Sequence, residues 1–141
     1  MTRRLLTLLL LFPAATCLAA DAETETRDLI ASAARALSAG KVELFLDAFD
    51  PAMPGFDKLR DLVAGLTGGF DVGCNIEIAR NEGDATERTL TLDWILTMEH
   101  KDLSPGAAQR QKTVKCRLKK TGKKWRIVSF DPVDLFTAPA E

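Results

Sequence analysis

Residues 90–98 read Leu-Thr-Leu-Asp-Trp-Ile-Leu-Thr-Met, with an apolar side chain at every second position. A period of two predicts a β-strand that turns one face to the core and the other to water. Three further stretches alternate in the same way, at residues 72–78, 114–118 and 125–130. The second half of the chain therefore predicts four strands in an antiparallel meander.

The first half of the chain has a helical period instead. Apolar residues recur every three or four positions in three segments, 26–39, 42–49 and 59–66. Residues that stop helices follow these segments, namely Gly40, Asp50-Pro51 and Gly68-Gly69. Helices grouped before strands predict an α+β domain, with three helices on one face of a four-stranded antiparallel sheet.

Short polar segments join the predicted elements. Pro54-Gly55 is a turn between helices, and Asn81-Glu82-Gly83 and Thr121-Gly122 have the residues of tight hairpin turns. A longer loop, residues 101–108, joins the second and third strands.

Three stretches of the chain serve as cues to a known family. They are Phe49-Asp50-Pro51, the strand at 90–98, and Lys123-Lys124-Trp125-Arg126-Ile127 followed by Asp131-Pro132. With this order of elements, residues 24–136 resemble the nuclear transport factor 2-like superfamily, which includes ketosteroid isomerase, scytalone dehydratase and SnoaL-like cyclases. The resemblance implies a cystatin-like cone, in which a strongly curved sheet wraps the helices around an apolar conical pocket.

The amino terminus has the pattern of a secretory signal peptide. Arg3 and Arg4 precede an apolar run at residues 5–12, and small residues follow to Ala20. We expect residues 1–20 to be removed after Ala19 or Ala20, leaving a single domain at 21–141 in an exported, periplasmic or secreted protein. A lipoprotein anchored at Cys17 and a retained membrane anchor are the alternatives.

Composition excludes several kinds of site. The chain has one His, three Cys and no Tyr, which argues against a zinc finger, a His-rich metal site and catalysis by paired histidines. No phosphate-binding glycine loop and no hydrolase or metalloprotease motif is present. We therefore expect no metal and no cofactor.

Extrapolating the strand pairing from the turns predicts a ligand site. It places Lys112 opposite Asp131, Met98 opposite Lys112, and His100 opposite Arg110. An apolar pocket with a polar rim would follow, suited to a small hydrophobic or anionic ligand. Its candidate residues are Trp94, Met98, His100, Arg110, Lys112, Ser129 and Asp131. The alternative is that the polar members are strand ends in water.

Function is expected to be ligand binding or protein interaction without catalysis. The alternative is an enzyme of the ketosteroid isomerase or dehydratase type, which needs a general base in a dry pocket and donors for an oxyanion. Ketosteroid isomerase uses a Tyr as one of these donors, and this chain has no Tyr. His100 with Asp131 or Asp50 is the remaining candidate pair.

Charge is unevenly distributed along the chain. Residues 110–126 carry nine Lys and Arg and no acid, whereas residues 21–109 carry 8 basic and 17 acidic residues. The predicted outer face of the last two strands would therefore be basic, with Lys115, Arg117, Lys119, Lys124 and Arg126. Such a face would contact an acidic partner, or a membrane at most peripherally, or would simply be solvated with Arg117 beside Asp93. Nucleic acid is not expected.

Two further expectations concern the sheet. The edge strand at 125–130, or the outer face with Ile95 and Val128, would support a homodimer. Cys74 and Cys116 fall on strands one and three of the meander, about 9.5 Å apart, which exceeds the reach of a disulfide. We expect two free thiols, with a Cys74–Cys116 bridge as the alternative.

Overall fold

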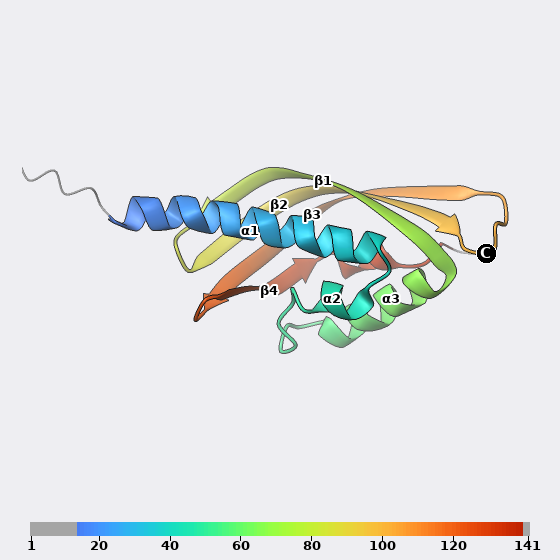
Figure 1. The fold of residues 1–141 in the computed structure, drawn as a ribbon, viewed down its shortest axis with the longest axis horizontal. Helices are drawn as coiled ribbons and strands as arrows, with labels where there is room; N and C mark the ends of the chain where they lie inside the picture. The colour runs from blue at the N-terminus through green and yellow to red at the C-terminus, as the bar shows by residue number, and fades with distance from the viewer. Residues whose placement is uncertain (1–13, 140–141) are drawn as a thin grey trace, which may run out of the picture.

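The computed structural model describes residues 14–139 and shows helices followed by a curved antiparallel sheet (Figure 1). The elements are α1 (Ala14–Ser38), α2 (Val42–Leu46), α3 (Phe56–Gly69), β1 (Phe70–Gly83), β2 (Glu87–His100), β3 (Ala107–Thr121), β4 (Lys124–Asp131) and a 3-10 helix, η1 (Val133–Phe136). The strands lie in the order β1-β2-β3-β4. The predicted α+β class, element order and strand order are confirmed.

Helix α1 lies along the sheet and buries one stripe of its surface against it. Ile30, Ala33 and Leu37 are almost fully buried, as their helical spacing requires. Gly40 follows the helix with φ +72°, a conformation that glycine adopts without strain. The helix begins at Ala14, so residues 14–20 of the predicted signal peptide form its first turns. The rest of that peptide lies outside the described residues.

Helix α2 is shorter than predicted because the chain leaves it to pair with β4. The amide of Asp50 donates to the carbonyl of Ile127 at 2.8 Å, and the amide of Ile127 donates to the carbonyl of Ala48 at 2.8 Å. These bonds cover the outer edge of β4 at one point, where Phe49 and Ile127 form a bridge. Helix α3 is longer than predicted, and β1 begins at Phe70, directly after Gly69.

The first hairpin turn lies later than Asn81-Glu82-Gly83. Strand β1 continues to Gly83, and the carboxylate of Asp84 accepts hydrogen bonds from the amides of Thr86 and Glu87. The second turn is Gly122-Lys123, between Thr121 and Lys124.

Helix η1, which the sequence pattern does not predict, returns the last described residues to the interior. Leu135 and Phe136 are fully buried. Together they close the side of the core where α3 and β3 contact η1.

Candidate functional site

The observed strand pairing differs from the pairing on which the predicted ligand site was based. Lys112 lies opposite Trp94, and Arg110 lies opposite Leu96. His100 pairs with Phe70 on β1 and lies beyond the paired part of β3. The predicted pairs Met98–Lys112 and His100–Arg110 were therefore wrong, because β3 begins at Ala107 and pairs with β2 from that point.

Pairing between β3 and β4 was also wrong. The register shifts between Arg117 and Leu118, and Asp131 lies opposite Lys115 instead of Lys112. Ser129 lies opposite Arg117, so it follows the outward-facing residues of β3. One extra residue in β4 at this irregularity changes which face the strand's last residues join.

The predicted polar rim is consequently dispersed along the sheet. Lys115, the neighbour of Asp131, pairs with Thr91 on β2, nine residues from His100. At 3.3 Å per residue this places Asp131 and His100 about 30 Å apart along the strand. The structure does not bring the two together.

Each remaining polar candidate has a local environment of its own. The guanidinium of Arg110 donates to the carbonyls of Leu135 and Thr137, both at 2.6 Å, and so holds the end of the chain. The ring of His100 packs 4.6 Å from that of Phe70. Lys112 is exposed. The contacts of Arg110 and His100 stabilise the fold.

The interior next to Trp94 is filled by aromatic rings. Trp94 and Met98 are 1% exposed. The Trp94 ring lies 5.5 Å from Phe136 and 5.9 Å from Phe130, and Phe45 lies 5.5 Å from Phe136. Where the resemblance implies an open conical pocket, the structure has a packed aromatic cluster.

Both cysteines of the predicted mature chain are free. Cys74 lies opposite Leu96 and Cys116 opposite Leu90, so they lie on non-adjacent strands and six residues apart along β2. The expectation of two free thiols agrees with this geometry. Burial raises the pKa of Cys116 to about 12, and it raises the pKa of Cys74 as well.

A groove of about 510 Å³ lies between α1 and β1. Its lining residues are Arg27, Ile30, Ala31 and Ala34 from α1 and Cys74, Asn75, Ile76, Glu77 and Ile78 from β1. The two alanines are short, so the helix surface stands back from the strand at this point. We take this α1–β1 groove as the candidate functional site.

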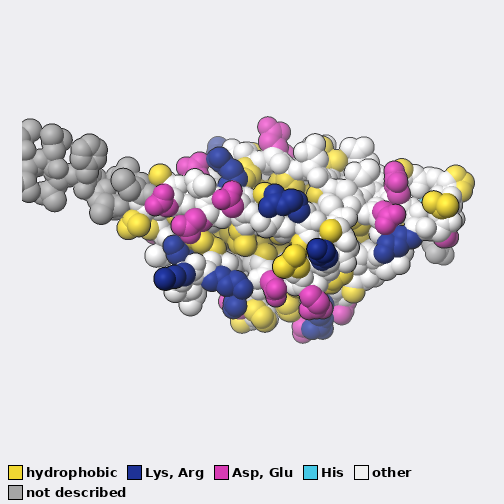
Figure 2. All heavy atoms as spheres, viewed as in Figure 1, with side chains coloured by type: hydrophobic (Ala, Val, Ile, Leu, Met, Phe, Trp, Pro, Cys, Tyr) yellow, Lys and Arg dark blue, Asp and Glu magenta, His cyan; other side chains and the backbone are white. Residues whose placement is uncertain are grey.

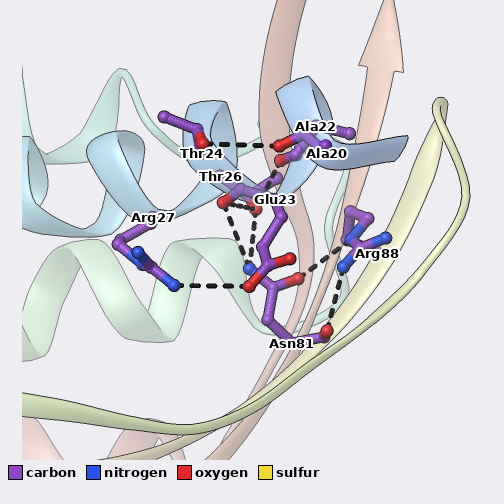
Figure 3. A network of polar contacts seen from close by, with 8 residues as sticks. All are labelled: Ala20, Ala22, Glu23, Thr24, Thr26, Arg27, Asn81 and Arg88. Atoms are coloured by element: carbon purple, nitrogen blue, oxygen red, sulfur yellow. Dashed lines mark hydrogen bonds and ion pairs between the residues drawn. The ribbon is translucent and has the colours of Figure 1, made fainter. Parts of the chain in front are cut away.

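A polar network ties α1 to the first hairpin next to the groove (Figure 3). The side-chain amide of Asn81 donates to Thr26 Oγ1 at 3.1 Å and to the carbonyl of Glu23 at 3.3 Å. Arg88, only 5% exposed, donates to the side-chain oxygen and the carbonyl of Asn81, both at 2.9 Å. The network fixes the distance between helix and strand just past Ile78.

This network was not predicted from the sequence, although the sequence contains one signal for it. Arg88 occupies the inward-facing phase of the 90–98 alternation, two positions before Leu90. A charged side chain at an inward position needs polar partners. The groove itself had no such signal, because alanines on a helix do not distinguish a packed face from an open one.

Charged side chains cover both surfaces. On the face that carries α1, positive and negative groups are interspersed with apolar atoms (Figure 2). On the outer sheet face, Lys115, Arg117, Lys119, Lys124 and Arg126 are exposed. Arg117 pairs with Glu87 and not with Asp93, which accepts from Thr113 instead. Contact of this basic surface with an acidic partner, and a homodimer through the sheet, remain predictions.

The described residues were also compared with the requirements of a metal site and of a membrane-spanning helix. Within residues 14–139, no three His, Cys, Asp or Glu side chains are grouped so as to hold a metal ion. In the same part of the chain, no helix combines the length and the apolar character needed to cross a membrane.

Comparison with known proteins places the fold. No protein-family model matches the sequence, and no curated protein matches it. Among solved structures, a nuclear transport factor 2-like superfamily protein from Salmonella enterica is 12% identical, with a TM-score of 0.65, covering 79% of this chain and 89% of its own.

Two other solved structures carry enzyme-like descriptions. A ketosteroid isomerase-like protein from Erwinia carotovora is 13% identical, with a TM-score of 0.60, covering 77% of this chain and 92% of its own. A protein from Novosphingobium aromaticivorans provisionally described as a scytalone dehydratase is 10% identical, with a TM-score of 0.68, covering 76% of this chain and 79% of its own. Identities this low show a shared fold and no more.

Proposed function

Starting from the nuclear transport factor 2-like fold that these similarities show, we propose that the chain is an exported, non-catalytic binding module. Its ligand site is the α1–β1 groove. The chain would present this groove on the outside of the cone, with the packed interior serving as support.

The observation that carries this proposal is the contrast between interior and groove. Ring contacts fill the space next to Trp94, whereas the groove has about 510 Å³ of open volume. Its walls include Ile30, Ile76 and Ile78, with Arg27 and Glu77 as charged members. The groove thus combines apolar and polar surface, and apolar side chains with a few convergent polar groups are the usual form of a small-molecule site.

The enzyme alternative has less support from the geometry. General acid–base chemistry needs a base within hydrogen-bond reach of the group it acts on. Asp131 lies about 30 Å from His100 along the sheet, in the register described above. The enzyme-like descriptions of two similar structures belong to proteins only 10% and 13% identical to this chain.

Filling the groove tests the proposal. The probe is 8-anilinonaphthalene-1-sulfonate, a fluorescent anion with an apolar body. We expect saturable binding to the mature chain and loss of that binding in Ala34→Phe, which places a ring in the groove. Ala64→Phe is the matched control, since Ala64 is an exposed alanine of α3.

Cooperative thermal unfolding of both variants shows that each is folded. Dye binding that is absent, or that is the same in both variants, would overturn the assignment of the groove as the ligand site.

A further inference from the structure

We infer that the occupant of the α1–β1 groove is a polypeptide segment in extended conformation, which pairs with the free edge of β1 as a fifth strand. This inference rests on the proposed function and names the chemistry of its ligand. The backbone groups of β1 that point into the groove determine the kind of ligand it can bind.

Strand β1 is an edge strand of unusual length for an exposed edge. It has 14 residues, and within residues 14–139 β2 is its single neighbour in the sheet. The other edge, on β4, pairs with the chain at Ala48 and Asp50. Long unpaired edges are templates for another strand, and proteins commonly cover or shorten them. Here the β4 edge is covered around Ile127, and the β1 edge borders the groove.

The direction of the β1 amides follows from hydrogen bonds at the ends of the sheet. The amide of Lys101 donates to the carbonyl of Gly69 at 3.1 Å, so Gly69 and Lys101 form a hydrogen-bonded pair. In an antiparallel ladder such pairs alternate with non-bonded ones. Up to the bulge after Ile78, the odd-numbered residues of β1 therefore bond to β2 and the even-numbered ones point away from it.

The opposite end of β2 gives an independent check. The amide of Lys120 donates to the carbonyl of Thr86 at 2.8 Å. The even-numbered residues of β2 therefore direct their backbone N–H and C=O groups toward β3. The odd-numbered residues of β2 must then direct their backbone N–H and C=O groups toward β1. The β1 residues opposite them are also odd-numbered, as in Asn75–Ile95. Both ends of the sheet give the same assignment.

Cys74, Ile76 and Ile78 consequently direct their N–H and C=O groups toward the groove. No backbone partner beyond the sheet is seen for these three residues in the described part of the chain. They span about 13 Å, room for an added strand of about five residues. A purely apolar ligand would desolvate these donors and acceptors without replacing their hydrogen bonds, which costs free energy. A peptide backbone satisfies them.

Side-chain positions suggest which peptides fit. Ile76 and Ile78 are half-buried and turn toward α1, whereas Asn75 and Glu77 lie on the outer face. Successive side chains of an added strand alternate in the same way. The peptide would place apolar residues against Ile30 and polar ones beside Glu77. The Asn81–Thr26 bond ends the groove just past Ile78.

The test selects binders from a bead-displayed library of heptapeptides that alternate apolar and polar residues. We expect binders whose affinity falls about tenfold when Ile76→Pro removes one groove-facing N–H, the effect of one lost hydrogen bond. Proline is tolerated on an edge strand where its N–H would face outward. The control Ile76→Ala keeps the N–H and removes the side chain.

Two further measurements test strand addition without the proline variant, in case that variant does not fold. The amides of an extended peptide form two alternating sets, one pointing toward β1 and one away from it. N-methylation of the first set should abolish binding, and N-methylation of the second set should leave binding unchanged. Amide exchange at Cys74, Ile76 and Ile78 of the wild-type chain should slow when a selected peptide binds.

Strand addition is overturned if no peptide is selected, if peptides methylated in either set bind equally, or if these amides gain no protection. Dye binding that Ala34→Phe abolishes would then show that the proposed function survives with a different kind of ligand. Loss of both results would remove the proposed function as well.

Discussion

Phe136 meets Trp94 edge-on inside the curved sheet, with ring centroids 5.5 Å apart and ring planes at 87°. Edge-to-face pairs at this distance are favourable beyond the area they bury. Through this contact the last turn of the chain closes the interior, so the fold leaves its accessible groove on the outside, next to α1.

Truncating Phe136 tests that closure. Because Phe136 is fully buried, we expect Phe136→Ala to lower the free energy of unfolding by about 3–5 kcal/mol through lost contacts and a cavity. Urea denaturation measures the change. Leu103→Ala is the control, since Leu103 is 92% exposed and its truncation should change stability by less than about 0.5 kcal/mol. Equal stability of the two variants would mean that η1 is not part of the core.

Glu25 joins the first helix to the last strand. Its carboxylate accepts from Trp125 Nε1 at 2.7 Å and from Lys120 Nζ at 3.3 Å. Trp125 is 5% exposed, so Glu25→Ala leaves a mostly buried N–H without its partner, and we expect a loss of about 1–3 kcal/mol. Glu25→Gln, whose amide oxygen still accepts, should lose less. The control is Asp28→Ala on the exposed side of the same helix; an equal loss there would contradict the role of Glu25.

Cys116 predicts a decline in stability at alkaline pH. Burial raises the pKa of its thiol to about 12 in the folded chain, whereas an unfolded cysteine has a pKa of about 8.5. Above the pKa of the unfolded cysteine, the unfolded chain loses a proton that the folded chain keeps. The contribution of Cys116 to the free energy of unfolding is therefore complete below that pKa. It falls as pH rises toward the pKa of the folded thiol. Urea denaturation between about pH 8 and 10.5 should show a steeper fall for the wild type than for Cys116→Ala. Parallel slopes would contradict the burial of this thiol.

Two acids face each other on the outer sheet surface, and they test the β1–β2 register. Asp71 lies opposite Glu99, and both are exposed. Like charges at opposed positions destabilise a sheet, whereas opposite charges contribute about 0.2–1 kcal/mol. Glu99→Lys should therefore stabilise the chain at low ionic strength and lose that gain at 1 M NaCl, where the screening length is about 3 Å. Glu99→Gln should show a smaller gain, and destabilisation by Glu99→Lys in low salt would argue for another register.

The fold was predictable from sequence where periodicity extended over a whole element. The alternation at 90–98 and the helical spacing of Ile30, Ala33 and Leu37 each determine a burial face, and these faces gave the correct class and strand order. Pairing was harder to predict, because alternation is unchanged when one strand slides by two residues. Irregularities after Ile78 and at Arg117 then shift the ladder by single residues.

The candidate site depended on features that periodicity does not report. Its predicted polar rim required the correct register over three strands. Lys112 lies opposite Trp94 instead of Met98, and Asp131 lies opposite Lys115 instead of Lys112, so Asp131 and His100 lie in different parts of the sheet. Helix η1 has four residues, too few to show a period. The groove arises from the short side chains of Ala31 and Ala34 beside an unpaired edge, a combination that exists only once the helix and the strand are placed together.

Processing of the amino terminus gives a final prediction. Within residues 18–38 of α1, Ala22 is the first buried residue, with 2% of its surface exposed. Leu18, by contrast, is 54% exposed. Cleavage after Ala19 or Ala20 therefore leaves every anchoring contact of Glu25 and Thr26 in the mature chain. We expect a chain of residues 21–141 to match the full-length protein in stability within about 1 kcal/mol, whereas residues 27–141 should be much less stable.

In a bacterial host, the periplasmic fraction should contain a protein whose mass corresponds to a first residue of Ala20 or Asp21. A chain that keeps its full mass in the cytoplasm contradicts export, and a membrane-bound chain that begins at Cys17 with added lipid mass supports the lipoprotein alternative.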